Sequence, residues 1–390
     1  MFDISTKERL EYLRDQGLWN GSCTASEATL HQLSPYIGKL KTGIVESLID
    51  EFSRPGQYVC DPFCGSGVVP LQAVIQRRRV FANDLSKYAW VLTMGKLTAP
   101  VDLNSAMKRV ECLTKYIEKT VTKVDARSIP RWVRQFFHPK TLKEVVAAFQ
   151  YCRKVNDHFL AACLCGILHH QRPGFLSYPA SHTVPYLRTS LFPHSEYPDL
   201  YSYRDINSRI IAKVTRAYRR FPGTDALQNA EYTVSCTDAK RLAIPDESVD
   251  LVLTSPPYYG ALDYARDNRL RLWFLGVRDW SELDQRLTKD GKNYEQQMRR
   301  SIKEMHRILK PGGHCILVVG EVQKNGKTKD TGDVLGKIAV DVSSGEFGID
   351  CFIEDQIPDL RRSRRGTRTT RIEKVLVLER RKTSVPRRQN

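Results

Sequence analysis

The segment TSPPYYG (residues 254–260) follows an apolar run, Val249–Leu253, and has the residue types needed to hold a planar amine. Two prolines fix the backbone φ angle and force a rigid exit from a strand. Such a turn holds the Ser255 hydroxyl, the nearby carbonyls and the Tyr258 ring in a fixed relation. The set can hydrogen-bond an exocyclic amine and stack on its ring. A Pro-stiffened turn without a chemical role is the simpler alternative.

The segment DPFCGSG (residues 61–67) lies between a short β run, Tyr58–Cys60, and a helix expected from about Val68. Gly65 and Gly67 allow a tight turn and a close approach to a ligand, and the helix N-terminus offers free N–H groups. The loop lacks both the GxGxxG spacing of dinucleotide sites and the lysine of a P-loop. Its ligand therefore need not carry phosphate.

Two acidic residues are expected at the ends of further strands. Asp84 follows a strand over Arg79–Ala82, and Asp238 ends a strand in EYTVSCTDAKRL. Each alone is more simply a cap or turn residue. Because the carboxyl ends of parallel strands meet at one edge of a sheet, both acids and the glycine loop outline a nucleoside pocket.

The elements that must position these groups alternate between strands and helices. Residues 34–52 have apolar positions at helical spacing, and residues 58–84 form a β-turn-α-β unit. Residues 101–230 are mostly helical, and the α/β pattern resumes from residue 231 to a closing strand over Arg371–Arg380. The pattern predicts an α/β fold with a mostly parallel sheet and a large helical insertion.

The insertion also contains a loop rich in Pro, Tyr and Ser. Its candidates for reading bases are Tyr178, His182, Tyr186 and Arg188, with a plain structural loop as an equal alternative. His169 and His170 have no Cys or carboxylate at metal spacing, so no metal site is predicted.

Composition is that of a folded protein with a polyanionic partner. The 390 residues are 41% hydrophobic with a net charge of +17, which argues against a disordered chain, a collagen-like repeat or a coiled-coil rod. No apolar run approaches a membrane span, no export signal is expected, and the 10 scattered Cys are expected to be reduced. The excess of basic residues favours nucleic acid. Residues 361–390 hold 12 Lys and Arg against 2 Glu.

Taken together, these motifs resemble the class I, S-adenosylmethionine-dependent amino-methyltransferases that act on DNA. DPFCGSG looks like the cofactor motif of that family, and TSPPY looks like its catalytic motif. SPYIGKLKTGIVESLI resembles the segment that precedes the cofactor loop, and LDYARDNRLRLWFLG and LKPGGHCILVVGE resemble segments after the catalytic loop. The resemblance covers about residues 34–98 and 231–380 and implies a Rossmann-like fold.

The resemblance also implies roles for individual residues. The methionine part of the cofactor would lie against Asp61, Phe63, Gly65, Ser66 and Gly67. Asp84 would hold the ribose hydroxyls, and Asp238 the adenine amino group. The target base would be bound by Ser255, Pro256, Pro257 and Tyr258.

The implied reaction is direct methyl transfer to an amine of a base flipped out of double-stranded DNA. Acceptors on Ser255 and Pro256 would favour a pyramidal nitrogen, and no covalent intermediate is needed because no Cys occupies a suitable loop. Ser at position 255 resembles the cytosine-N4 enzymes more than the adenine-N6 enzymes, which remain the alternative. Phosphates would be bound by a loop holding Arg361, Arg362, Arg364, Arg365 and Arg368, with weaker candidates at Arg266, Arg269 and Arg271.

Three rival functions stay open. They are an RNA base methyltransferase, a protein glutamine methyltransferase and a catalytically silent nucleic-acid-binding module. The intact glycine loop, both acidic strand ends and the whole catalytic loop argue against the silent module.

The predicted organisation has five parts. They are an N-terminal helical segment (1–33), a cofactor-binding half (34–100), the insertion (101–230), which serves either target recognition or structural support, a catalytic half (231–380) and a disordered basic tail (381–390). The resemblance places the protein in a prokaryotic cytoplasm. It leaves open the recognition sequence, the oligomeric state and the existence of a companion restriction endonuclease.

Overall fold

A computed structural model describes residues 4–20, 27–170, 174–181, 184–257, 264–286, 291–324, 327–356 and 372–382. Its strands are β1 (Tyr58–Asp61), β2 (Arg79–Asn83), β3 (Tyr232–Ser235), β4 (Val249–Thr254), β5 (Leu309–Gly320), β6 (Val322–Lys324), β7 (Lys327–Lys329), β8 (Phe347–Gln356) and β9 (Ile372–Arg380). Its α-helices are α1 (Thr6–Asp15), α2 (Thr42–Phe52), α3 (Val68–Ile75), α4 (Lys87–Leu97), α5 (Leu103–Thr120), α6 (Arg131–Arg134), α7 (Pro139–Val155), α8 (His158–Ile167), α9 (Ile206–Ala217), α10 (Thr224–Gln228), α11 (Tyr264–Asp267), α12 (Arg269–Phe274), α13 (Trp280–Arg286), α14 (Gly291–Ile308) and α15 (Thr331–Val342).

A seven-stranded sheet in the order β3-β2-β1-β4-β5-β9-β8 forms the centre of the fold. The strands from β3 to β5 run parallel, whereas β9 is antiparallel to both β5 and β8. The strand order reverses between β1 and β4, which creates a crevice at the carboxyl ends of these two strands. The predicted class I methyltransferase fold, with a mostly parallel sheet and helices, is confirmed.

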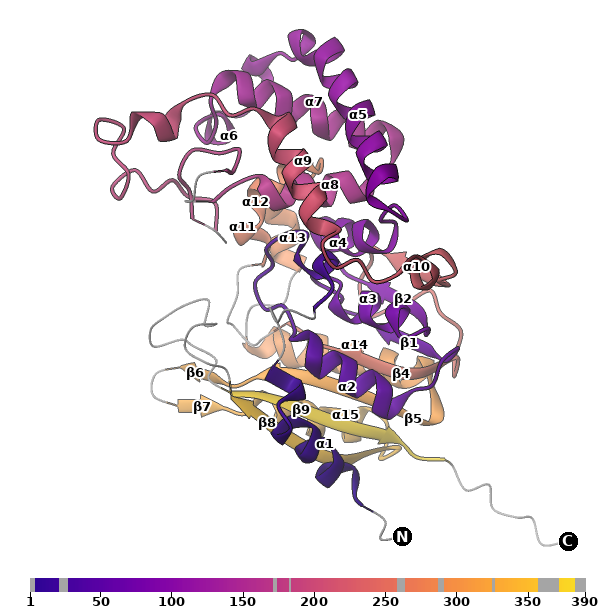
Figure 1. Ribbon diagram of the computed structural model, residues 1–390. Helices are drawn as coiled ribbons and strands as arrows, with labels where there is room; N and C mark the ends of the chain where they lie inside the picture. Colours follow the sequence, from indigo (N-terminus) through magenta and orange to yellow (C-terminus); the bar gives the residue numbers. More distant parts are fainter. Residues whose placement is uncertain are drawn as a thin grey trace, which may run out of the picture.

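The sheet separates two hydrophobic cores because successive side chains of a strand point to opposite faces. In β4, Leu251 and Leu253 belong to one core and Val252 to the other. The first core also contains residues of α2, α3, α4 and α8, and the second contains residues of α14 and α15. Helices therefore cover both faces of the sheet, as Figure 1 shows.

Helices α5 to α9 stack as a lobe on α4, and in Figure 1 this lobe lies above the sheet. The joint between α4 and α8 is tight: a Cβ at Gly95 would lie 2.7 Å from the His158 carbonyl oxygen and 2.7 Å from the Ala162 Cβ. Only a glycine lets the two helices approach this closely.

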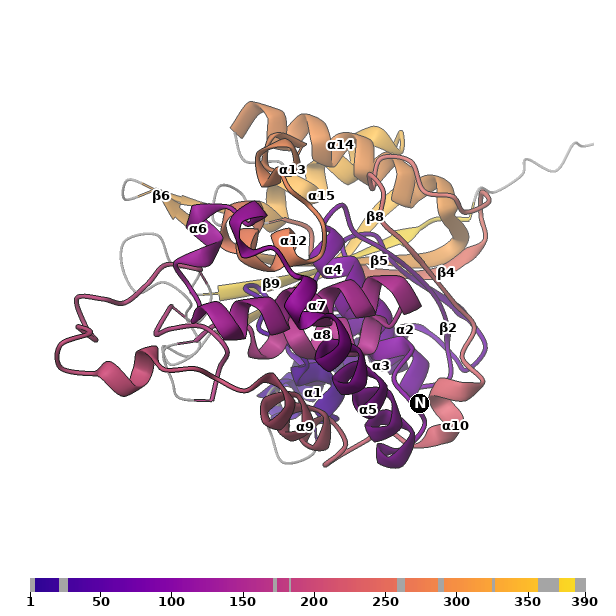
Figure 2. The same ribbon diagram turned by 90° about the horizontal axis from the view of Figure 1, so that it is seen from above.

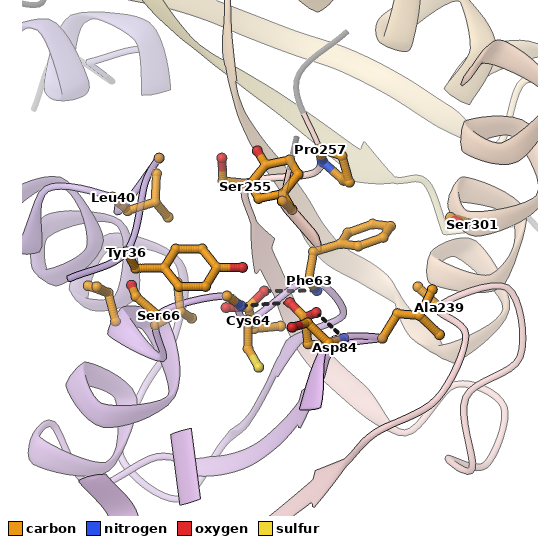
Figure 3. A pocket seen from close by; sticks show the side chains of 18 of the residues that line it. Tyr36, Leu40, Phe63, Cys64, Ser66, Asp84, Ala239, Ser255, Pro257 and Ser301 are labelled. Carbon is orange, nitrogen blue, oxygen red and sulfur yellow. Dashed lines mark hydrogen bonds between the residues drawn. The ribbon is translucent and has the colours of Figure 1, made fainter. Parts of the chain in front are cut away.

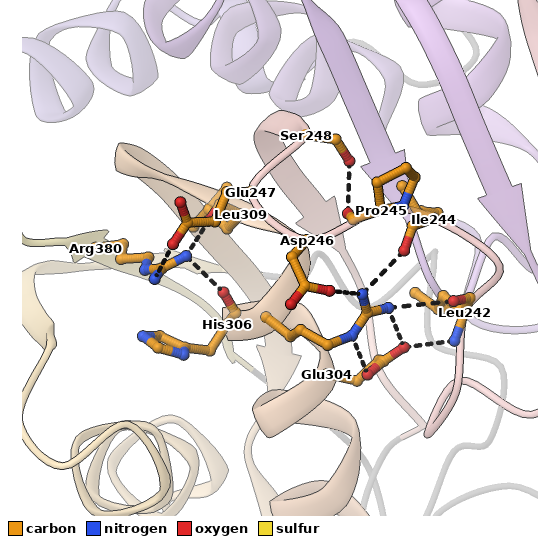
Figure 4. A network of polar contacts seen from close by, with 11 residues as sticks. Leu242, Ile244, Pro245, Asp246, Glu247, Ser248, Glu304, His306, Leu309 and Arg380 are labelled. Carbon is orange, nitrogen blue, oxygen red and sulfur yellow. Dashed lines mark hydrogen bonds and ion pairs between the residues drawn. The ribbon is translucent and has the colours of Figure 1, made fainter.

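A polar network fixes α14 to the chain between β3 and β4 (Figure 4). Arg307 contacts Glu304 at 2.7 Å and donates to the Ile244 carbonyl at 2.9 Å. Glu304 in turn accepts the Leu242 N–H at 2.6 Å, and Arg380 of β9 pairs with Glu247 at 2.7 Å. The network matters because α14 provides one wall of the pocket described below.

Several boundaries differ from the sequence expectation. Strand β3 ends at Ser235, so Asp238 lies in the following loop and not at a strand end. The helix expected over residues 34–52 begins only at Thr42, and β5 begins at Leu309, within a segment expected to close a helix. Helix α15 and the edge strand β8 were not predicted. No helix in the described part of the chain is long and apolar enough to span a membrane.

Candidate functional site

A pocket with about 940 Å³ of open space lies at the carboxyl ends of β1 and β4 (Figure 3). Its lining includes eight of the predicted site residues: Asp61, Phe63, Gly65, Ser66, Asp84, Asp238, Ser255 and Pro257. The structure therefore brings the glycine loop, both acidic residues and the Pro-Pro turn to one cavity, although 171 residues separate Asp84 from Ser255.

The glycine loop turns sharply between β1 and α3. Gly65 and Gly67 have φ angles of +46° and +71°, and residues that carry a side chain rarely adopt this backbone conformation. A Cβ at Gly67 would lie 2.7 Å from the Thr93 Oγ1, and one at Gly65 would lie 3.1 Å from the Tyr36 ring. Gly67 does not line the pocket, so its part is to shape the loop.

Asp61 connects the glycine loop to the end of β4. Its carboxylate accepts the Thr254 hydroxyl at 2.6 Å and the Phe63 N–H at 3.2 Å. Burial raises the pKa of Asp61 to about 7, and these two hydrogen bonds oppose that rise. Thr254 directly precedes Ser255, so this bond sets the distance between the two halves of the site.

Asp84 closes the glycine loop from the end of β2. Its carboxylate accepts the Gly65 N–H at 2.9 Å and the Ser86 N–H at 2.8 Å. Burial raises the pKa of Asp84 to about 6, against the lowering effect of these N–H groups. Each oxygen keeps a lone pair for a ligand hydroxyl.

Asn83, which sequence reasoning missed, positions the loop of Asp238. Its fully buried amide donates to the carbonyls of Pro62 and Thr237 at 3.1 and 3.0 Å, and its Oδ1 accepts the Thr237 N–H at 3.1 Å. Asp238 itself pairs with Lys240 at 2.8 Å. The only signal in the sequence was an amide residue directly before Asp84.

Tyr36 forms the opposite wall of the pocket and was also missed. Its ring stacks on Tyr88 at 5.8 Å between centroids, and Tyr264 of α11 lies 6.5 Å away. Burial raises its pKa well above the usual value, so the phenol stays protonated. The Tyr88 hydroxyl donates to the Pro35 carbonyl at 2.6 Å and thereby fixes the chain directly before Tyr36.

Lys96 of α4 holds the glycine loop in place through a hydrogen bond to the loop backbone. Its ammonium is buried and donates to the Ser66 carbonyl at 2.5 Å. Burial lowers the pKa of Lys96 well below its usual value. Further wall residues that no motif indicated come from α13 and α14: Arg286, Gln297, Met298 and Ser301.

The catalytic turn is described only in part. Ser255 is half-buried and lines the pocket with Pro257, whereas Pro256 between them is buried and does not line it. Tyr258 lies outside the described residues, as do Arg361, Arg362, Arg364, Arg365 and Arg368. Their predicted roles stay predictions.

The three helix arginines that were weaker candidates for binding phosphate differ in exposure. Arg271 is buried, lies over the Tyr88 ring and donates to the Cys165 carbonyl at 3.3 Å, so it supports the fold. Arg269 donates to the Pro185 carbonyl at 2.5 Å, which fixes the Tyr-rich loop to α12, and Arg266 is exposed. Of the arginines that the structure describes here, Arg266 fits the predicted role best.

The Tyr-rich loop has both buried and exposed positions. Tyr178 contacts the Tyr201 ring and donates its N–H to the Phe136 carbonyl at 2.7 Å. Tyr186 is exposed and carries the Arg188 guanidinium over its ring, and His182 lies outside the described residues. No group of His, Cys, Asp or Glu in the described ranges could hold a metal ion, and the absence of a metal stays a prediction.

Residues 249–367, from β4 through the Arg-rich segment, match the model of the N6/N4 DNA methylase family. Over these residues the chain is similar to that family. This confirms the resemblance inferred from the motifs and, with it, S-adenosylmethionine as the cofactor of the family. The match includes the Pro-Pro turn and excludes the glycine loop.

Relatives are similar over limited regions. The type II methyltransferase M.SfiI of Streptomyces fimbriatus is 32% identical over 78 residues, which are 20% of this chain and 15% of that protein. A putative DNA modification methylase of Thermus thermophilus, solved with S-adenosyl-L-methionine, is 23% identical over 37% of this chain and 51% of its own (TM-score 0.23). A SAM-dependent methyltransferase of Methanosarcina mazei is 14% identical over 86% of this chain and 97% of its own (TM-score 0.33).

Proposed function

We propose that this protein is a site-specific DNA methyltransferase that methylates the exocyclic N4 amine of a flipped cytosine with S-adenosylmethionine. The observation that carries the proposal is that Ser255 and Pro257 line the same pocket as Gly65, Asp84 and Asp238. Base-binding and cofactor-binding candidates thus share one cavity, as direct methyl transfer between two bound molecules requires.

The lining residues suit S-adenosylmethionine. Two buried carboxylates, Asp61 and Asp84, offer acceptors to a cationic ligand with hydroxyl groups. Asp84 would hold the ribose, Asp238 the adenine amine, and the backbone of the loop at Gly65 the methionine part. When bound, the cofactor supplies an electrophilic methyl group on a sulfonium.

The residues of the chain provide acceptors and alignment. The Ser255 hydroxyl and the Pro256 carbonyl would accept the two amine hydrogens of the base, which leaves its nitrogen lone pair free. Acceptors that are already in place where positive charge develops stabilise the transition state without reorganisation. The hydrogen bond between Thr254 and Asp61 holds this turn close to the glycine loop.

The proposed contacts with DNA are of two kinds, to the flipped base and to the phosphates. Tyr258 would stack on the base, and Arg361, Arg362, Arg364, Arg365 and Arg368 would contact the backbone. Cytosine N4 is preferred over adenine N6 because Ser at position 255 resembles the cytosine-N4 enzymes more than the adenine-N6 enzymes, although a neutral Ser suits either amine chemically. The protein would work on chromosomal DNA in a prokaryotic cytoplasm, with residues 101–230 as the part that recognises the target.

The test uses the purified protein, labelled S-adenosylmethionine and unmethylated genomic DNA, followed by digestion to nucleosides and mass spectrometry. N4-methylcytosine supports the proposal, whereas N6-methyladenine keeps the site and overturns the base assignment. Label in RNA or in protein would overturn DNA as the substrate. A Ser255→Ala variant that retained full transfer would remove Ser255 from the catalytic residues.

A further inference from the structure

The corner between α6 and the start of α7 carries a basic surface that the proposed site does not use. Arg127, Arg131, Arg134 and Lys140 are all exposed there, and we refer to them as the α6 patch. Residues 126–143 contain no Asp or Glu. In the described part of the chain, none of these four side chains forms an ion pair. A cationic surface without acidic partners keeps its full potential for an anionic ligand.

The α6 patch is attached firmly to the rest of the protein. Lys140 lies 4.2 Å above the Tyr203 ring, and the Tyr203 hydroxyl donates to Glu144 at 2.8 Å. The same Tyr-rich loop is bound to the catalytic half through the Arg269–Pro185 hydrogen bond. The patch therefore has a fixed position relative to α12.

Figures 1 and 2 both place α6 on the side of the molecule that carries the Tyr-rich loop and β6, and in Figure 1 α11 lies on this side too. The long helix α5, which belongs to the same lobe, lies toward the opposite side. α11 contributes Tyr264 to the pocket. Helix α6 therefore lies on the side of the molecule that carries α11, one of the elements that line the pocket.

We propose that the α6 patch binds the phosphate backbone of double-stranded DNA whose target base occupies the pocket. This inference rests on the proposed function and adds a second DNA contact on the insertion. Guanidinium and ammonium groups that form no ion pair with described residues gain by releasing counterions from DNA. Such contacts are independent of sequence, so the patch fixes the position of the duplex and leaves base reading to other residues.

The chain offers a matched control on α5. Lys108, Lys115 and Lys119 are exposed in the same lobe, but Glu111 and Glu118 lie among them, and Lys115 pairs with Glu111 at 2.6 Å. Two triple variants remove the same charge: Arg127→Gln/Arg131→Gln/Arg134→Gln in the patch, and Lys108→Gln/Lys115→Gln/Lys119→Gln on α5.

The measurement is the affinity of the full chain and both variants for an unmethylated DNA duplex between 50 and 200 mM salt. Three lost phosphate contacts reduce the log–log slope by about 2.7, so wild type loses about 40-fold more affinity over this range than the patch variant. The α5 variant should show the same slope of affinity against salt as the wild type. Equal slopes for the two variants would overturn the inference.

Methyl transfer by each variant separates this inference from the proposed function. If wild type methylates DNA and the patch variant keeps the wild-type slope, only the inference fails. If wild type methylates no DNA, the proposed function fails, and the inference fails with it. A slope change confined to an RNA duplex would also overturn DNA as the partner of the patch.

Discussion

Two buried carboxyl groups beside the expected position of a cation predict that cofactor binding releases protons. Burial raises the pKa of Asp61 to about 7 and that of Asp84 to about 6. At pH 6.5, a carboxyl group with a pKa of 7 is protonated in about three quarters of the molecules, and one with a pKa of 6 in about one quarter. Without a bound cation, the pair therefore holds about one proton.

A sulfonium near these groups favours their ionised forms and lowers both pKa values. S-adenosylmethionine should therefore release up to about one proton at pH 6.5. At pH 8, the same pKa values leave only about 0.1 proton on the pair, so release almost disappears. S-adenosylhomocysteine has no sulfonium charge and should release fewer protons at pH 6.5 than S-adenosylmethionine does.

Isothermal titration calorimetry in two buffers of different ionisation enthalpy measures the number of protons released. Asp61→Asn should remove most of the release at pH 6.5. Asp84→Asn should remove its own smaller part and also lower the pKa of Asp61, which the charge of Asp84 raises. A binding enthalpy for S-adenosylmethionine that is independent of the buffer at pH 6.5 would refute the reasoning. Equal release with both ligands would show that the charge of the sulfonium is not felt by these carboxylates.

Three further substitutions test the support of the pocket. Gly67→Ala should lower the free energy of unfolding by about 2 kcal/mol or more, measured in urea, because of its positive φ and the 2.7 Å approach to Thr93 Oγ1. Lys96→Met should weaken cofactor binding measured by calorimetry, because the Ser66 carbonyl loses its donor. The pKa of Lys96 is lowered in the folded state, so wild-type stability should rise with pH up to about 10.5, and this rise should shrink in the variant. Asn83→Ala should cost about 1–3 kcal/mol of unfolding free energy, because buried partners are left unpaired, and should reduce cofactor affinity.

The site residues that could be predicted from the sequence are those whose role depends only on their neighbours in the chain. Gly65 and Gly67 follow a strand and open a helix, and the prolines after Ser255 stiffen a strand exit. Each of these signals lies within a few residues, and parallel strands bring such turns to one edge. The fold class and eight of the residues that line the pocket could therefore be predicted without coordinates.

The supporting contacts could not be predicted because their partners are distant in the chain. Thr254 and Asp61 are 193 residues apart, and Asn83 and Thr237 are 154 apart. The expected strand end at Asp238 was wrong because β3 pairs with β2 only through Ser235. An edge strand has one partner, so its limits depend on a register that the local sequence does not encode.

The position of the insertion explains how the pocket can form without it. The insertion lies between α4 and β3, and β3 is the strand at one edge of the sheet. Among the described residues that line the pocket, none falls between residues 87 and 237. The described residues that line the pocket thus come from the segments on either side of the insertion, and the insertion packs on α4. No described residue of this lobe lines the pocket, and the arginines of the α6 patch form no ion pair with described residues. Both facts fit the proposed role of the lobe in binding DNA and not the methyl donor.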